Sequence, residues 1–194
     1  MVGFLVCFIL VNKQIGGSTM EVGKDTTIVR LSQTQPDEIR RIMVELVGKK
    51  MKVKIYNGLK ELDECYPDFE KWYYSKVIPE FERKDDKREI IVSVSSDLNK
   101  NLTTVSGIAI LKKTDNEKKI CTIKVHSQYR NKGIGSKLFE ESFKYLETDR
   151  PIMTVSENTM PYFNNFINKY KFELSVIRKD YYKKGISEYF YNIR

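Results

Sequence analysis

Lys118–Leu146, KKICTIKVHSQYRNKGIGSKLFEESFKYL, is the stretch that decides the fold. Its first part, Ile120–Val125, is rich in β-branched residues and shows little polar alternation, which predicts a strand covered on both faces. Its last part, from Ile134 to Leu146, repeats apolar residues at three- and four-residue spacing, which predicts an amphipathic helix. The residues between these two parts therefore join a strand to a helix.

The joining segment, Arg130–Ser136, contains two glycines, Gly133 and Gly135. Because neither carries a Cβ, the backbone there can turn sharply and approach a ligand closely. The first N–H groups of the following helix have no intrahelical acceptor and lie at the positive end of the helix dipole. Such a strand, glycine turn and helix start are typical of a phosphate or pyrophosphate site. The alternative is a turn that needs glycine only for its geometry.

Spacing separates the known phosphate loops. A P-loop needs two glycines with four residues between them, followed by lysine, and a dinucleotide fingerprint needs a third glycine where Leu138 stands. The segment reads R-x-x-G-x-G instead, with Arg130, Gly133 and Gly135 at the defined positions. This resembles the acetyl-CoA pyrophosphate loop of the GNAT superfamily of N-acetyltransferases.

The order of expected elements also resembles this family from Met51 to Arg194. The resemblance implies an α/β (α+β) GNAT fold, with a central mixed, mostly antiparallel sheet that is splayed at the acetyl-CoA site and flanked by helices. Propensity and periodicity predict strands at 52–56, 88–95, 106–112, 120–125, 151–156, 172–178 and 188–193. They predict helices at 59–65, 68–78, 134–146 and 160–170, with Pro79 ending the second and a polar hairpin loop at 97–104.

Residues 1–50 form an N-terminal extension of uncertain role, and residues 51–194 form the expected acetyltransferase domain. The apolar run Val2–Val11 is too short to span a bilayer as a helix. Thr26–Leu31 predicts a short strand, and a helix-start signal at Thr34 leads into an amphipathic helix that ends at Gly48. Met20 and Met51 are alternative starts, and the domain from residue 51 is expected to fold without the extension.

The resemblance implies how the cofactor, acetyl-CoA, is held. The backbone of Ile123 and Val125 would hydrogen-bond the pantetheine arm as if it were another strand. Asn158 resembles a family asparagine that touches the cofactor, although it lies two residues out of register. The acetyl group would lie where the strand at 120–125 splays from the strand at 151–156. The pyrophosphate would be held by backbone N–H groups of Arg130, Asn131, Lys132, Gly133, Ile134, Gly135 and Ser136.

The catalytic groups are less well marked. Many members carry a tyrosine acid in the last helix, but Ile167 stands at that position here. Tyr162 is the first substitute for the acid that protonates the leaving thiolate, and Tyr170 is the second, although either could serve packing alone. Glu117 is the best carboxylate for the base, with His126 behind it. A hairpin-turn charge is the plainer role for Glu117, and a base acting through water is another alternative.

Composition limits the other classes of function. The net charge of +8 suggests an anionic ligand or partner, and coenzyme A would use part of it. Three cysteines without C-x-x-C spacing and a single histidine indicate no metal site and a reducing, cytoplasmic compartment. No membrane span is expected, and a homodimer is an open alternative.

The sequence therefore predicts an N-acetyltransferase that moves an acetyl group from acetyl-CoA to an amine by direct attack. The acceptor stays open between a small molecule, a peptide or protein, and an aminoacyl-tRNA. The alternative function is a catalytically inactive GNAT-like module that binds acyl-CoA or regulates a nucleic-acid-associated process. The intact Arg130–Gly135 loop favours the enzyme, whereas the absence of a tyrosine at position 167 leaves the inactive module open as the alternative.

Overall fold

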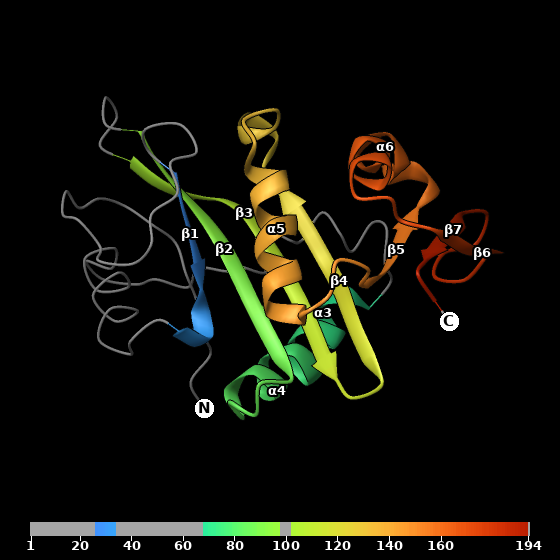
Figure 1. The fold of residues 1–194 in the computed structure, drawn as a ribbon, viewed down its shortest axis with the longest axis horizontal. Coiled ribbons are helices and arrows are strands. Elements are labelled where there is room, and N and C mark those ends of the chain that lie inside the picture. The colour runs from blue at the N-terminus through green and yellow to red at the C-terminus, as the bar shows by residue number, and fades with distance from the viewer. Residues whose placement is uncertain (1–25, 34–67, 98–101, 194) are drawn as a thin grey trace.

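The computed structural model describes residues 26–33, 68–97 and 102–193. Its centre is a seven-stranded sheet with the order β1-β2-β3-β4-β5-β7-β6 (Figure 1). Among the described pairs only β4 and β5 run parallel, so the sheet is mixed and mostly antiparallel, as expected. The strands are β1 Thr26–Arg30, β2 Arg88–Asp97, β3 Leu102–Thr114, β4 Glu117–Val125, β5 Ile152–Ser156, β6 Leu174–Lys179 and β7 Ser187–Tyr191.

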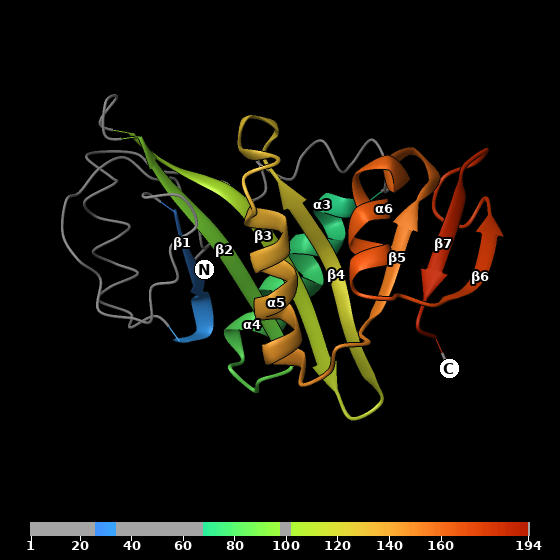
Figure 2. The same ribbon diagram turned by 45° about the horizontal axis from the view of Figure 1, so that its top comes forward.

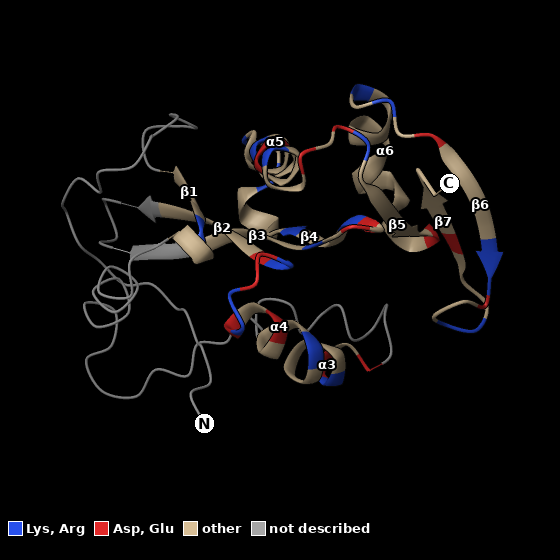
Figure 3. Cartoon of the chain, turned by 60° about the horizontal axis from the view of Figure 1, so that its bottom comes forward, with Lys and Arg blue, Asp and Glu red and all other residues tan. Residues whose placement is uncertain are grey.

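Helices cover both faces of the sheet (Figures 2 and 3). On one face lie α5, Ile134–Leu146, and α6, Met160–Lys169. Buried residues of α5 pack there on inward side chains of the sheet: Ile91, Ala109, Leu111, Ile120, Met153 and Val155. On the other face lie α3, Phe69–Trp72, a π-helical turn, Tyr73–Val77, and α4, Ile78–Glu82. Their apolar residues pack on Ile90, Val92, Ile108 and Ile110.

The helix on the second face does not end at Pro79, so that expectation was wrong. The Ile78 N–H donates to the Tyr73 carbonyl, which closes the π-helical turn just before the proline. Pro79 then lies in the first turn of α4, directly after the π-helical turn. The helix therefore continues to Glu82 and carries Ile78 into the core.

The β2–β3 hairpin is longer than expected. Pairing continues to Asp97 and Leu102, so residues 97 and 102–104, which the sequence assigned to a loop, belong to the strands. The next hairpin is tight, since Thr114 pairs with Glu117 across two residues. These extensions bring β4 alongside β3 over its full length.

The strand β1 belongs to the same sheet. It pairs antiparallel with β2 over five residue pairs, from Thr26 with Ser95 to Arg30 with Ile91. Beyond it, the Ser32 N–H donates to the buried Glu89 carboxylate at 3.2 Å. We therefore propose that the domain includes β1 and does not begin at Met51. The helix expected at 34–48 and the elements expected at 52–65 lie outside the described residues.

Only Ile120 of β4 is fully buried. The strand still packs on both faces, because Cys121 contacts the cluster on the α3–α4 side and Ile123 and Val125 contact the cluster on the α5 side. The rest of β4 is half-buried, although its sequence is as apolar as that of a central strand. No helix in the described ranges is long and apolar enough to cross a membrane.

Candidate functional site

The parallel strands β4 and β5 separate soon after they meet. Lys119 pairs with Ile152 and Ile120 with Met153, and no further pair joins the two strands in the described part of the chain. Both continue, β4 to Val125 and β5 to Ser156. Beyond Ile120, the side of β4 that faces β5 is therefore left without a neighbouring strand. This is the splayed sheet that the sequence led us to expect.

The glycine loop lies at the open end of this splay. A short 3₁₀ helix, Ser127–Tyr129, follows β4, and Asn131 and Gly133 then take positive φ angles of 60° and 79°. Gly133 is the N-cap of α5, and without a side chain it cannot cap the N–H groups of the first turn. That turn contains no acidic residue. The loop thus presents uncapped N–H groups and a positive dipole end beside Arg130 and Lys132.

Gly135 has a role that the sequence did not reveal. A Cβ at this position would come within 2.7 Å of Cζ of Phe166 in α6. The Phe166 ring is itself held by Phe139, with ring centroids 4.9 Å apart. Gly135 therefore allows α5 and α6 to approach closely, whatever else it does for a bound phosphate.

Arg130 joins the loop to both β4 and α6. Its Nε donates to the Val125 carbonyl at 3.4 Å, and its guanidinium carbon lies 4.5 Å from the ring centroid of Tyr162. The structure thus brings Tyr162, from the first turn of α6, to the glycine loop. The Tyr162 ring is 58% exposed, so it is not a core residue. The Val125 carbonyl, which the sequence assigned to the pantetheine arm, is already an acceptor for Arg130.

The other candidates in this region have different surroundings. The Tyr170 hydroxyl donates to the Ser136 carbonyl at 3.3 Å, and its ring packs on Phe139 and Phe143, so Tyr170 joins α6 to α5. Asn158 is exposed in the short 3₁₀ helix Glu157–Thr159 that precedes α6. His126 accepts from the Gln128 N–H at 3.4 Å and caps the turn after β4.

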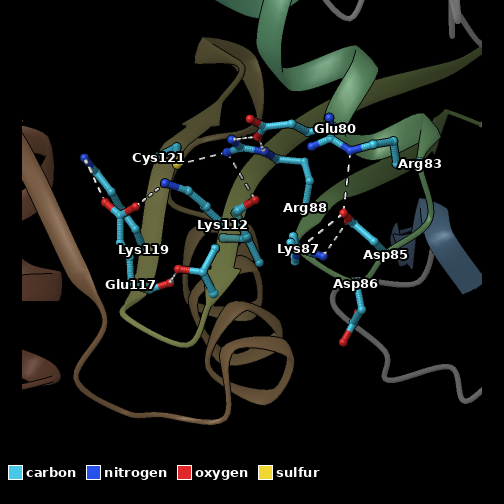
Figure 4. Close-up of polar contacts among 12 residues, drawn as sticks. Glu80, Arg83, Asp85, Asp86, Lys87, Arg88, Lys112, Glu117, Lys119 and Cys121 are labelled. Atoms are coloured by element: carbon cyan, nitrogen blue, oxygen red, sulfur yellow. Dashed lines mark hydrogen bonds and ion pairs between the residues drawn. The ribbon is translucent and has the colours of Figure 1, made fainter.

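Glu117 lies at the opposite end of β4 from the loop (Figure 4). It bonds to Lys112, and its second oxygen lies 4.0 Å from Lys119 Nζ. Burial raises the pKa of Glu117, but the hydrogen bond from Lys112 and the charges of Lys112 and Lys119 outweigh this and hold the pKa below its usual value. At about 3.3 Å per residue, the eight steps from Glu117 to Val125 span roughly 26 Å. The structure therefore does not bring Glu117 and Tyr162 together.

The sequence analysis missed a second carboxylate, Glu188 of β7. Its side chain is 0% exposed, and neither oxygen has a hydrogen-bond partner in the described part of the chain. Burial raises the pKa of Glu188 to about 7. The Ser156 hydroxyl lies across the strand pair, near enough to lower this pKa in part, but its geometry does not meet that of a hydrogen bond. One signal was present: Glu188 occupies the same strand face as Phe190, where alternation calls for an apolar residue.

The raised pKa of Glu188 predicts a pH-dependent stability. An unfolded glutamate ionises near pH 4.5, whereas the folded protein keeps the proton until about pH 7. Between these values the folded state binds one more proton, so the free energy of unfolding should fall as pH rises, by about 1–3 kcal/mol. Urea unfolding from pH 4.5 to 8 measures this. Glu188→Gln should make the fall smaller by this amount, and an equal slope in the two proteins would contradict the prediction.

Metal ligands are not clustered in this region. Among residues 26–33, 68–97 and 102–193, no group of three or more His, Cys, Asp or Glu side chains is placed to hold a metal ion. Cys121 lies beside Arg88, whose Nη1 is 3.3 Å from the sulfur and which also bonds to Glu80 (Figure 4). This thiol is part of the packing between β4 and α4.

Comparison with known proteins agrees with this geometry. The model of the acetyltransferase (GNAT) family matches residues 55–161, more than half of the chain. A search of curated proteins finds no significant match. Among solved structures, 79 chains match significantly.

Two of these structures share most of the fold. A protein described as a GNAT-family acetyltransferase from Desulfovibrio desulfuricans is 14% identical with a TM-score of 0.56, and the match covers 86% of this chain and 96% of that one. The ribosomal-protein-S18-alanine N-acetyltransferase from Escherichia coli is 14% identical with a TM-score of 0.53, covering 86% and 91%.

Other matches are partial. The chain spans 65% of the length of nourseothricin acetyltransferase, with 14% identity and a TM-score of 0.48. It spans 63% of a protein described as a streptothricin acetyltransferase from Bacillus anthracis, solved with acetyl coenzyme A, with 18% identity and a TM-score of 0.46 over 55% of this chain. The family match, the splayed sheet and the glycine loop together show that the chain belongs to the GNAT family of acetyltransferases, whose co-substrate is acetyl-CoA.

Proposed function

We propose that this protein transfers the acetyl group of acetyl-CoA to an amine by direct attack. The observation that supports this most is that β4 loses its neighbour β5 at the same end where it leads into the uncapped start of α5. One strand thus offers a free edge for an extended ligand and a site for that ligand's pyrophosphate.

The residues present fit acetyl-CoA. The unpaired edge from Cys121 to Val125 suits a pantetheine arm, which can hydrogen-bond a strand edge. The N–H groups of Ile134, Gly135 and Ser136 in the first turn of α5 suit the pyrophosphate, and Arg130 and Lys132 add positive charge. When bound, acetyl-CoA supplies a thioester carbonyl that an amine can attack.

Tyr162 is our proposed acid for the leaving thiolate. Its ring lies over the Arg130 guanidinium, which links it to the loop that would hold the cofactor. Glu117 is a weaker candidate for the base. Its ion pairs with Lys112 and Lys119 keep the carboxylate ionised, but they also occupy its oxygens.

The function is tested by calorimetry with acetyl-CoA and by acetylation of small amines, peptides and aminoacyl-tRNA. Tight cofactor binding with turnover on one of these classes supports the enzyme and identifies its acceptor. Tight binding without turnover on any of them would favour the regulatory module instead. No binding of acetyl-CoA would contradict both.

Reversing one charge in the loop should weaken cofactor binding. Lys132→Glu places a negative charge beside the proposed pyrophosphate site, and we expect the Kd for acetyl-CoA to rise about ten-fold. Lys144→Glu is the control, because Lys144 lies in the last turn of α5 and changes the net charge equally. If calorimetry gives both variants the same Kd, the pyrophosphate does not bind at this loop.

A further inference from the structure

The most unusual polar group in the described residues is the Glu188 carboxylate. It is fully buried, and within the described residues neither this carboxylate nor the buried hydroxyl of Thr154 on β5 has a hydrogen-bond partner. Buried polar groups are nearly always satisfied, because leaving one unpaired costs the full penalty of removing it from water. Two such groups on neighbouring strands indicate a site for a polar ligand.

Strand register places these groups on one face. Glu188 pairs with Ser156, and Thr154 pairs with Phe190, so all four side chains point to the same side of β5 and β7. The alternate residues Met153 and Val155 pack with the α5 cluster on the opposite side. Glu188 therefore lies on the face away from α5 and α6.

The same register places Glu188 next to the splay. Pairing between β4 and β5 ends at Met153, and Ser156 is the last residue of β5, three positions further on. Its cross-strand neighbour Glu188 thus lies beside the part of β5 that has separated from β4. The proposed cofactor site and the carboxylate approach the splay from opposite faces of the sheet.

Tyr182, in the loop between β6 and β7, is 39% exposed. Burial raises the pKa of the Tyr182 hydroxyl to about 12, and nearby acidic groups add to this. Those groups come from the neighbouring loop, β7 and β4: Tyr181, Glu188, Cys121 and Glu117. Tyr182 therefore lies near titratable groups of both β7 and β4.

The cation on the neighbouring strand does not neutralise Glu188. Arg178 is the cross-strand neighbour on β6, but its guanidinium carbon lies over the rings of Tyr181 and Phe190, at 5.5 and 5.3 Å from their centroids. No ion pair joins Arg178 to Glu188 within the described residues. The carboxylate thus remains available to a positive group brought by a ligand.

We propose that Glu188 binds the ammonium group of a cationic primary amine, together with Thr154 and Ser156, and removes its proton before acetyl transfer. This inference rests on the proposed function and assigns the substrate class and the base of that same site. One N–H proton passes to the Glu188 carboxylate and then to solvent. The neutral nitrogen forms a C–N bond with the acetyl carbon as the C–S bond breaks, and the sulfur takes the electron pair. The nitrogen then loses its second proton, which balances the proton that the thiolate receives.

The first test needs no knowledge of the natural acceptor. In protein carrying ¹³C-labelled glutamate carboxyls, one resonance should titrate near neutral pH, and it should be absent from Glu188→Gln. Butylammonium chloride should shift this resonance, while tetramethylammonium chloride, which has no N–H donor, should shift it much less. No shift with butylammonium in the presence of coenzyme A would overturn the proposed site.

The second test measures turnover with ethylamine, butylamine and benzylamine. Glu188→Gln should lower kcat/KM by about 10²- to 10⁴-fold and remove the limb of the pH profile near neutrality, with an unchanged Kd for acetyl-CoA. Glu188→Asp should recover part of the activity. Glu173→Gln, at an exposed ion pair with Arg150, is the matched control and should behave as the parent.

A chemical control separates base catalysis from structural support. Trifluoroethylamine is largely unprotonated at neutral pH, so its acetylation should lose much less in Glu188→Gln than that of ethylamine. Equal losses for the two amines, or none, would overturn the role of Glu188. If the parent acetylates no amine at all, the proposed function fails, and the carboxyl titration with butylammonium still decides whether Glu188 binds an ammonium group.

Discussion

Tyr162→Phe should lower kcat for amine acetylation by about 10²- to 10⁴-fold, because it removes the hydroxyl proposed to protonate the leaving thiolate. The ring should stay over the Arg130 guanidinium, since phenylalanine keeps the aromatic face. The Kd for acetyl-CoA should therefore hardly change. Turnover measured over a range of pH, with calorimetry on the same samples, gives both quantities.

Tyr170→Phe is the matched control for this experiment. The Tyr170 hydroxyl donates to the Ser136 carbonyl rather than facing Arg130, so its loss should affect stability modestly and turnover little. Unchanged turnover in Tyr162→Phe would remove Tyr162 from the mechanism. A matching fall in cofactor affinity would show that Tyr162 serves binding through Arg130 and not proton transfer.

Gly135→Val should destabilise the protein by about 3 kcal/mol, because its side chain would collide with the Phe166 ring. For a chain of this length that corresponds to a fall in Tm of roughly 6–12 °C. Differential scanning calorimetry measures it. The ring cannot easily move aside, since Phe139 stacks against it.

The double variant Gly135→Val with Phe166→Ala separates packing from cofactor binding. Removing the ring makes room for the valine. The double variant should therefore lose less stability than the sum of the losses in the two single variants. If acetyl-CoA binding recovers with the packing, Gly135 serves the contact between α5 and α6. If binding stays weak in a folded double variant, close approach of the pyrophosphate requires glycine there.

Local patterns predicted the part of the fold that surrounds the cofactor site. The strand, loop and helix from Ile120 to Leu146 were correct because their signals lie within a few residues of one another. The course of the helix past Pro79 was not predicted, because it depends on a π-helical turn that no residue type marks. The place of β1 in the sheet was also missed, since its partner β2 lies about 60 residues away in sequence.

The site was predictable to a similar degree. Arg130 and Gly133 follow from a motif, whereas Glu188 becomes notable only when β5–β7 register sets it beside Ser156 and burial leaves it unpaired. Glu117 was favoured because it begins the central strand, but sequence position could not show that Lys112 would bond to it across the hairpin. Catalytic roles depend on such long-range neighbours, which a single sequence does not reveal.

The pairing of β1 with β2 also protects the protein from self-association. β2 pairs with β3 along one edge and with β1 along the other. Without Thr26–Arg30, the backbone N–H and C=O groups on the β1 edge of β2 would have no strand partner. Such an open edge, on a strand that contains the run Ile90-Ile91-Val92, is a template for joining the same strand of another molecule. A product beginning at Met51 would leave this edge of β2 exposed. The short strand β1 therefore covers an aggregation-prone edge in addition to extending the sheet.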